Sequence, residues 1–124
     1  MDDTIRRALT RGHLIEITTT GRRTGLPRRI AVVFHVIGGR VYIAGMASSR
    51  KRAWLANLED EPRMTFHLKG SARADLDAVA RPIDDEVERR SLFGEIVKSW
   101  TSQDLETMVA LSPLVEVTFP PSAA

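Results

Sequence analysis

The sequence of 124 residues has no cysteine and no long apolar run. The absence of cysteine excludes a disulfide framework, a thiol nucleophile and a cysteine-ligated metal, and it suits a reducing cytoplasm. No stretch approaches the roughly 18 continuous apolar residues that span a membrane, and the N-terminal residues lack the apolar segment of a secretory signal. We therefore expect a cytoplasmic protein without a transmembrane segment, folded as one domain over residues 1–124.

Motifs for several common kinds of catalysis are also missing. The chain has neither a phosphate-binding P-loop nor a GxGxxG fingerprint, and no serine lies in a nucleophile-elbow pattern. The three histidines, His13, His35 and His67, are too scattered to predict a metal site, so we expect no metal. His35 and His67 lie inside expected strands, where a hydrogen-bonded structural histidine is more common than a catalytic one. The acids at 84–88 are typical of an exposed helix start rather than of paired catalytic carboxylates.

Positive charge is concentrated in the first half of the chain. Residues 1–52 contain eleven lysines and arginines against three acids, a net +8, whereas residues 53–124 contain seven against thirteen, a net −6. This imbalance predicts a basic face or groove, for which a phosphate, a carboxylate-bearing ligand, nucleic acid or an anionic lipid would be a suitable partner. Only Phe34 and Tyr42 are aromatic in the basic half, so it lacks the interleaved aromatics of single-strand binders and we expect no nucleic acid.

Residues 18–29, TTTGRRTGLPRR, place four arginines in one turn between two apolar runs. Gly21 and Gly25 free backbone N–H groups to point at an anion, and each guanidinium offers a planar fork that suits phosphate or carboxylate. The turn therefore predicts an anion site, with a solubilising surface turn as the alternative. A second basic cluster, Arg50 to Arg52, is expected at the start of a helix, where it could join the first cluster in one groove.

Periodicity predicts six strands and three or four helices. Strands are expected at 13–19, 29–37, 41–45, 64–69, 72–80 and 114–119, with turns at Gly38-Gly39 and Gly70-Ser71. Helices are expected from Asp3 or Thr4 to Leu9, at 48–62 with Ser48 or Ser49 as its cap, from 84 to 100, and at 102–111. In 64–69 the alternation points Met64, Phe66 and Leu68 inward and His67 outward. Six mostly antiparallel strands with few helices predict an α+β fold, mainly β, built as a small barrel or curled sheet with flanking helices.

Three segments of the chain carry a family resemblance. The string TTGRRTGLPR is followed by an apolar strand, then by GGRVYIA and by AWLANLEDEPRM. Together, over about residues 14–82, they resemble the deazaflavin-dependent nitroreductase and quinone reductase family, which binds the 8-hydroxy-5-deazaflavin coenzyme F420. The resemblance implies a six-stranded split β-barrel, related to flavin reductases and to pyridoxamine phosphate oxidase, and pairing as a homodimer.

The same resemblance implies where the cofactor binds. The turn from Gly21 to Gly25, with Arg28, would meet the anionic tail of F420, its phosphate and oligoglutamate, while Arg29 would open the next strand. The expected cofactor contacts are Arg22, Arg23, Thr24, Gly25, Arg28, Ile30, Ala31, Val32, Ala44, Gly45, Met46, Trp54 and Asn57. Trp54 could equally be a core anchor of its helix, whereas Asn57 is the stronger candidate because a buried amide needs partners.

Two departures separate this chain from the family pattern. Relatives commonly carry SKGG after the third strand, whereas this chain has the slightly shorter segment from Met46 to Arg52, whose arginines would supply the missing charge. Its C-terminal helix carries Ser99, Trp100 and Thr101 in place of the tyrosines that face the substrate in some relatives. The substrate of those relatives therefore does not carry over to this chain.

These features predict a reductase that passes a hydride from reduced F420 to a small acceptor such as a quinone, a nitroaromatic or an activated enone. Because the cofactor would carry the chemistry, no acid–base constellation is needed, and solvent, Ser48, Ser49 or Tyr42 could supply a proton. Two alternatives stay open. One is an FMN-binding oxidoreductase whose arginines hold one phosphate, and the other is a non-enzymatic module that binds nucleic acid or an anionic lipid.

Overall fold

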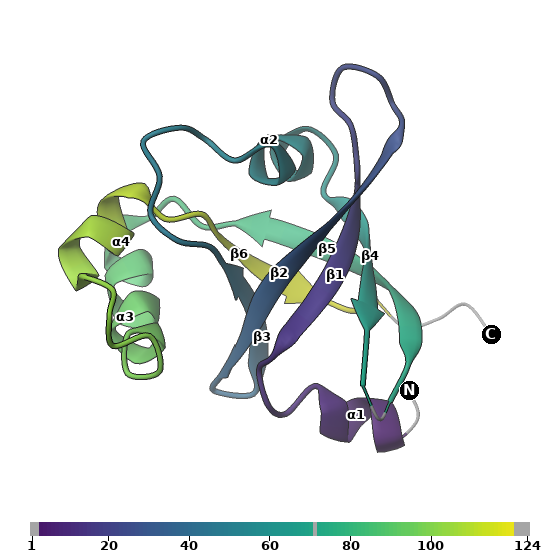
Figure 1. Ribbon diagram of the computed structural model, residues 1–124, viewed down its shortest axis with the longest axis horizontal. Helices are drawn as coiled ribbons and strands as arrows, with labels where there is room; N and C mark the ends of the chain where they lie inside the picture. Colours follow the sequence, from purple (N-terminus) through teal and green to yellow (C-terminus); the bar gives the residue numbers. More distant parts are fainter. Residues whose placement is uncertain (1–2, 71, 121–124) are drawn as a thin grey trace.

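A computed structural model describes residues 3–70 and 72–120 (Figure 1). Its elements are α1 (Asp3–Ala8), β1 (Leu14–Thr20), β2 (Pro27–Ile37), β3 (Arg40–Ala44), α2 (Ala53–Asp60), β4 (Arg63–Leu68), β5 (Ala74–Pro82), α3 (Glu86–Ile96), α4 (Leu105–Leu111) and β6 (Leu114–Thr118). The strands close into a barrel in the order β1-β2-β3-β6-β5-β4, and all neighbouring pairs are antiparallel. The predicted six-stranded α+β barrel is confirmed. Ser71, predicted to share a turn with Gly70, lies outside the described residues.

The barrel is filled by every second residue of its strands. Ile15 and Ile17 of β1 are buried, and the residues between them face outward, because successive side chains of a strand point to opposite faces. At the centre the rings of Phe34 and Phe66 meet edge to face, with centroids 5.3 Å apart, and both rings are fully buried. The predicted inward residues of β4 are all buried as well, so alternation located this core from the sequence.

The hairpin of β1 and β2 extends beyond the barrel as an arm, and α2 lies beside it (Figure 1). β2 has 11 residues but pairs with β3 only from Val33 onward, so its first half lies outside the β2–β3 ladder. The face that lines the barrel core continues along the arm as Thr19, Arg28 and Ile30, and here α2 lies against it. The arm and α2 therefore form the two walls of a pocket above the barrel.

Two helices, α3 and α4, pack on the outside of the barrel against β3 and β6 (Figure 1). A second apolar cluster joins Tyr42 and Ala44 of β3 to Phe93 of α3 and Met108 of α4. Arg89 of α3 holds the end of α4, because its guanidinium donates at 2.6–3.3 Å to the backbone carbonyls of Ile83, Met108, Val109 and Ser112. No helix within residues 3–70 and 72–120 has the length and apolar character needed to cross a bilayer.

The start of α2 differs from its prediction. Ser48 and Ser49 precede the helix, which begins at Ala53 with Arg52 in the N-cap position and no side-chain cap. The backbone N–H of Ser48 donates to the carbonyl of Leu111 at 3.2 Å, which docks this segment against the end of α4 and delays the helix. The prediction that Ser48 or Ser49 caps the helix is therefore wrong.

The two strand histidines have different environments. His67 lies on the outer face of the barrel, as predicted, yet it is only 7% exposed and both of its ring nitrogens are hydrogen-bonded. His35 packs edge to face against Trp100, with centroids 5.1 Å apart, and its Nε2 is buried with no partner among the described residues. Burial lowers the pKa of His35. The prediction of a hydrogen-bonded structural histidine is confirmed for His67 and wrong for Nε2 of His35.

Acid should destabilise this fold. A hydrogen bond from Arg29 lowers the pKa of Glu16, one from Arg81 lowers that of Glu88, and burial lowers that of His35. Each lowered pKa means that the unfolded chain binds more protons than the folded chain at the same pH. The stabilisation that these three groups contribute is therefore present at neutral pH and is lost as the pH falls. We expect the urea midpoint to decline from about pH 6.5, where unfolded histidine titrates, and more steeply below about pH 4.5, where unfolded carboxylates titrate. A midpoint that stayed level down to about pH 3 would contradict this expectation.

Candidate cofactor site

The pocket between the arm and α2, here called the arm pocket, has a volume of about 440 Å³. It is lined by Thr19, Gly21, Arg22, Arg23, Thr24, Arg28, Ile30, Ala53, Trp54 and Asn57. Most of these residues were expected as cofactor contacts from the sequence. Residues that lie more than 20 positions apart in the chain thus meet because the arm and α2 pack side by side.

The turn at the tip of the arm is held by its own backbone. The N–H of Gly21 donates to the carbonyl of Leu26, and the N–H of Gly25 donates to the carbonyl of Gly21, both at 2.8 Å. Gly25 has a φ of +70°, a left-handed conformation that glycine adopts without strain. The hydroxyl of Thr24 accepts from the N–H of Leu26 at 3.2 Å. The turn therefore folds without using any arginine side chain.

Three of the four arginines have no side-chain partner among the described residues. Within the part of the chain that the structure describes, the side chains of Arg22, Arg23 and Arg28 form no ion pair and no hydrogen bond, and all three are exposed. Arg29 instead points to the outer face, where its Nε lies 2.5 Å from a carboxylate oxygen of Glu16. The strand was expected to open at Arg29 but begins at Pro27, and the cofactor contacts of Arg22, Arg23 and Arg28 stay a prediction. Three uncompensated cations around one pocket create a positive potential that favours an anion.

Asn57 fixes the arginine turn to α2. Its side chain is buried, with 7% exposed, and its Oδ1 accepts from the backbone N–H of Arg22 at 3.1 Å. Its Nδ2 donates to the hydroxyl of Thr19, also at 3.1 Å. Because a buried amide without partners is costly, these two bonds set the position of the turn relative to the helix.

The opposite wall of the arm pocket is apolar. Trp54 and Ala53 of α2 face Ile30 of β2, and the half-buried ring of Trp54 also packs against the barrel core. Trp54 is thus a core anchor that also lines the pocket, and its contact with the cofactor stays a prediction. Gly45 lies beside it, because a Cβ on Gly45 would lie 3.8 Å from Cζ2 of Trp54 and only 2.8 Å from Cγ of Pro113. A side chain at position 45 would push this segment away from Pro113.

The remaining expected residues lie outside the arm pocket. Val32 points into the barrel core, Ala31 faces outward on the same strand, and Gly25 is at the exposed tip of the turn. Ala44 and Tyr42 are buried beneath α3 and α4, and Met46 is 56% exposed in the segment before α2. Burial, with the charge of Glu116, raises the pKa of Tyr42.

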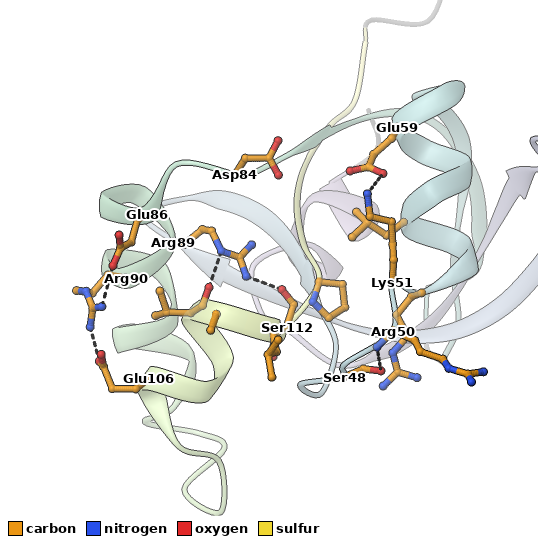
Figure 2. A pocket seen from close by; sticks show the side chains of 16 residues that line it. Ser48, Arg50, Lys51, Glu59, Asp84, Glu86, Arg89, Arg90, Glu106 and Ser112 are labelled. Atoms are coloured by element: carbon orange, nitrogen blue, oxygen red, sulfur yellow. Dashed lines mark hydrogen bonds and ion pairs between the residues drawn. The ribbon is translucent and has the colours of Figure 1, made fainter.

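A second cavity of about 630 Å³, here called the helix cleft, lies between α2 with the segment before it and the helices α3 and α4 (Figure 2). Figure 2 shows Ser48 and Arg50 on one side and Asp84, with the ion-paired Glu86, Arg90 and Glu106, on the other. Lys51 belongs to this cleft and pairs with Glu59 at 2.7 Å. The two basic clusters therefore line separate cavities, and the expected single groove is wrong, because α2 presents Trp54 and Asn57 to the arm pocket and Leu55 and Glu59 to the helix cleft.

Two residues of the arm pocket were not expected from the sequence. Thr19 was read only as part of a strand, although its place in the alternation after Ile15 and Ile17 puts it on the inner face. A polar residue at a position of the strand that should face the core was therefore the signal in the sequence that Thr19 lines a pocket. Ala53 carried no signal, because a small residue at a helix start is common.

Comparison with known proteins identifies the family of this chain. Residues 2–117 match the family described as F420H(2)-dependent quinone reductase. The protein Rv2991 from Mycobacterium tuberculosis has a similar structure, with a TM-score of 0.75 at 17% identity over 98% of this chain and 81% of that one. An F420-H2 dependent reductase, FDR-A, has a TM-score of 0.59 at 22% identity over 85% of this chain and 93% of that one. A structure described as a domain-swapped dimer has a TM-score of 0.61 at 22% identity over 85% and 79%. With almost its full length matched, the chain belongs to the F420H2-dependent quinone reductase family.

Proposed function

We propose that the arm pocket binds F420 and that the arginine turn holds the anionic tail of this cofactor. The observation that carries the proposal is the set of three guanidinium groups, Arg22, Arg23 and Arg28, that have no partner in the described part of the chain and lie on a turn whose backbone holds it without them. A phosphate followed by glutamate carboxylates, the tail that the family resemblance implies, matches these cations in charge and in bidentate geometry.

The residues present fit a ligand with an anionic tail and a flat ring system. The cationic rim suits the tail, and the apolar wall of Trp54, Ala53 and Ile30 suits a ring that must be shielded from water. Reduced F420 supplies a hydride when it is bound, and a small acceptor such as a quinone, a nitroaromatic or an enone receives it. The protein contributes binding energy through the arginines, orientation through Asn57, and exclusion of water through Trp54.

We assign the proton that completes reduction of the acceptor to solvent. None of the three candidate donors, Ser48, Ser49 and Tyr42, lines the arm pocket. Ser48 lies in the helix cleft, and the raised pKa of the buried Tyr42 opposes loss of its proton. The reaction then needs no titratable side chain at the acceptor, in agreement with the absence of an acid–base constellation in the sequence.

We also propose that residues 1–124 act as one cofactor-binding domain and that two copies form a homodimer. The closed barrel with its attached helices supports the first point. The relative described as a domain-swapped dimer supports the second. The matching family is described as F420H(2)-dependent, which favours F420 over FMN as the cofactor. FMN is the comparison ligand in the experiment below.

Titration of oxidised F420 into the purified protein, followed by deazaflavin fluorescence, tests the proposed function. We expect saturable binding at micromolar protein in low salt, and weaker binding as salt screens the arginines. FMN, with one phosphate and no glutamate tail, should bind more weakly under the same conditions. Absence of F420 binding would overturn the proposal, and equal or tighter binding of FMN would reassign the pocket to a flavin.

A further inference from the structure

Three side chains on the outer face of the barrel form a continuous chain of hydrogen bonds. They come from three neighbouring strands: Thr18 from β1, His67 from β4 and Asp75 from β5. The hydroxyl oxygen of Thr18 lies 2.7 Å from Nε2 of His67, and Nδ1 of the same ring lies 2.6 Å from Oδ1 of Asp75. The pairing of the strands brings together residues that are 49 and 8 positions apart in the sequence.

The hydrogen bonds define which atoms carry protons. An ionised Asp75 can only accept, so Nδ1 of His67 must donate to it, and the hydrogen bond with His67 lowers the pKa of this carboxyl group. In a neutral imidazole the other nitrogen, Nε2, is then an acceptor, and the Thr18 hydroxyl must be the donor. This is the arrangement of a nucleophile, a general base and a residue that orients the base.

Charged residues surround His67 on the other strands. Glu16 of β1 is paired with His67 in the β1–β4 ladder and accepts from Arg29 of β2 at 2.5 Å and from Lys69, just after β4, at 3.0 Å. Arg29 is also the cross-strand partner of Thr18, and its charge helps to lower the pKa of Asp75. A cation beside the threonine can stabilise negative charge that develops near the hydroxyl during acyl transfer.

Thr18 lines a cavity other than the arm pocket. This cavity has a volume of about 380 Å³ and is lined by Thr18, Thr19, Thr20, Gly25, Pro27, Glu61, Arg63, Met64, Thr65 and Asp77. The neighbouring residue, Thr19, points to the opposite face of β1. Thr19 lines both cavities, but its hydroxyl accepts from Asn57 on the side of α2, whereas the hydroxyl of Thr18 points to the other face of the strand.

We propose that Thr18, His67 and Asp75 form a second, hydrolytic site that cleaves small activated carboxylic esters. Oγ1 of Thr18 attacks the ester carbonyl and forms a new C–O bond, while Nε2 of His67 takes the hydroxyl proton. The bond to the alcohol breaks, and the leaving oxygen receives that proton. Water, deprotonated by His67, then attacks the acyl-threonine; the C–O bond to Oγ1 breaks, His67 returns the proton to Oγ1, and the carboxylic acid is released. Asp75 is a positioning residue that holds the imidazole in the required tautomer.

Hydrolysis of p-nitrophenyl acetate by the full-length protein tests this site, with release of p-nitrophenol as the readout. Thr18→Val and His67→Gln should each lower kcat/KM by about tenfold or more, the range of general base catalysis, whereas Thr18→Ser should retain the rate because it keeps a hydroxyl. Asp75→Asn, which keeps an acceptor oxygen but loses the charge, should lower kcat and leave KM unchanged. Thr65→Val is the matched control, because Thr65 lines the same cavity and is the β4 partner of Thr18, while the hydroxyl at Nε2 of His67 is that of Thr18.

Two outcomes would overturn the proposal. If Thr18→Val hydrolysed the ester as fast as the unchanged protein, a histidine acting alone, or no site at all, would account for the rate. If Thr65→Val lost as much activity as Thr18→Val, the effect would belong to the surface as a whole. Circular dichroism checks that each variant is folded. F420 binding is measured on the same variants, because the proposed cofactor site uses the opposite face of β1; this measurement separates failure of the hydrolytic site from failure of the proposed cofactor function.

Discussion

Replacement of Arg22, Arg23 and Arg28 by glutamine should weaken F420 binding by about 100-fold. Each arginine is exposed and unpaired in the described structure, so each charge-assisted contact to the cofactor tail is worth about 1 kcal/mol after screening by solvent. Three such contacts amount to about 3 kcal/mol, which is close to two orders of magnitude in the dissociation constant. The titration of deazaflavin fluorescence measures the loss directly. Stability should hardly change, because the turn is held by backbone bonds and by Asn57.

The salt dependence of binding gives a second readout of the same change. The unchanged protein should lose affinity as salt is raised, since exposed charges are screened over about 10 Å at 0.1 M salt, and the triple variant should lose much less. A triple variant at Arg6, Arg7 and Arg73 removes the same total charge from exposed positions outside the arm pocket, and it should bind normally. Equal losses in the two triple variants would mean that net charge, rather than the arginine turn, attracts the cofactor.

The sequence predicted the fold well because its signals are local. Alternation along β4 and the apolar run of β2 identify strands wherever these segments sit in the molecule, and Gly38-Gly39 forms its hairpin with both glycines at positive φ. The arginine turn could be singled out for the same reason, since crowded like charge needs an explanation within a few residues. Family resemblance then connected this turn to the helix that carries Trp54 and Asn57.

The parts that could not be predicted depend on contacts between distant strands. His67 was expected outward, but nothing local indicates that Thr18 and Asp75 occupy its nitrogens or that Arg29 and Lys69 converge on the neighbouring Glu16. The chain of hydrogen bonds appears only when the order β1-β4-β5 and its register are known.

The residues that line the arm pocket could be predicted only in part, for a similar reason. Resemblance named runs of consecutive residues, whereas a strand presents alternate residues to a site. Ile30 therefore reaches the arm pocket, and its neighbour Ala31 faces the other way. Val32 has the correct parity but lies farther down the strand, where the arm has become the barrel wall and the inner face is core.

Asn57 connects stability to cofactor binding, and Asn57→Leu should reduce both. The leucine has a similar volume but leaves the N–H of Arg22 and the hydroxyl of Thr19 without their partners. Two lost bonds at a buried position should lower the free energy of unfolding by about 2–4 kcal/mol, as measured in urea. F420 affinity should fall by about tenfold, because the turn loses the bond that sets its position against α2. Thr19→Val removes only one of the two bonds and should cost about 1 kcal/mol.

The control for Asn57 is the next residue along the helix. Leu58 is fully buried in the barrel core and does not line the arm pocket, so Leu58→Ala should cost about 2–5 kcal/mol of stability, at least as much as Asn57→Leu. Below the unfolding transition it should bind F420 almost normally, since the arginine turn keeps its anchor. If the two variants lost affinity in proportion to their stability, Asn57 would be one more core residue. In a double-mutant cycle, Asn57→Leu should cost less when Thr19 is already valine, by about 0.5–1 kcal/mol, because the two side chains share one hydrogen bond. That coupling, together with a loss of affinity specific to Asn57, would show that the helix positions the turn through this single amide.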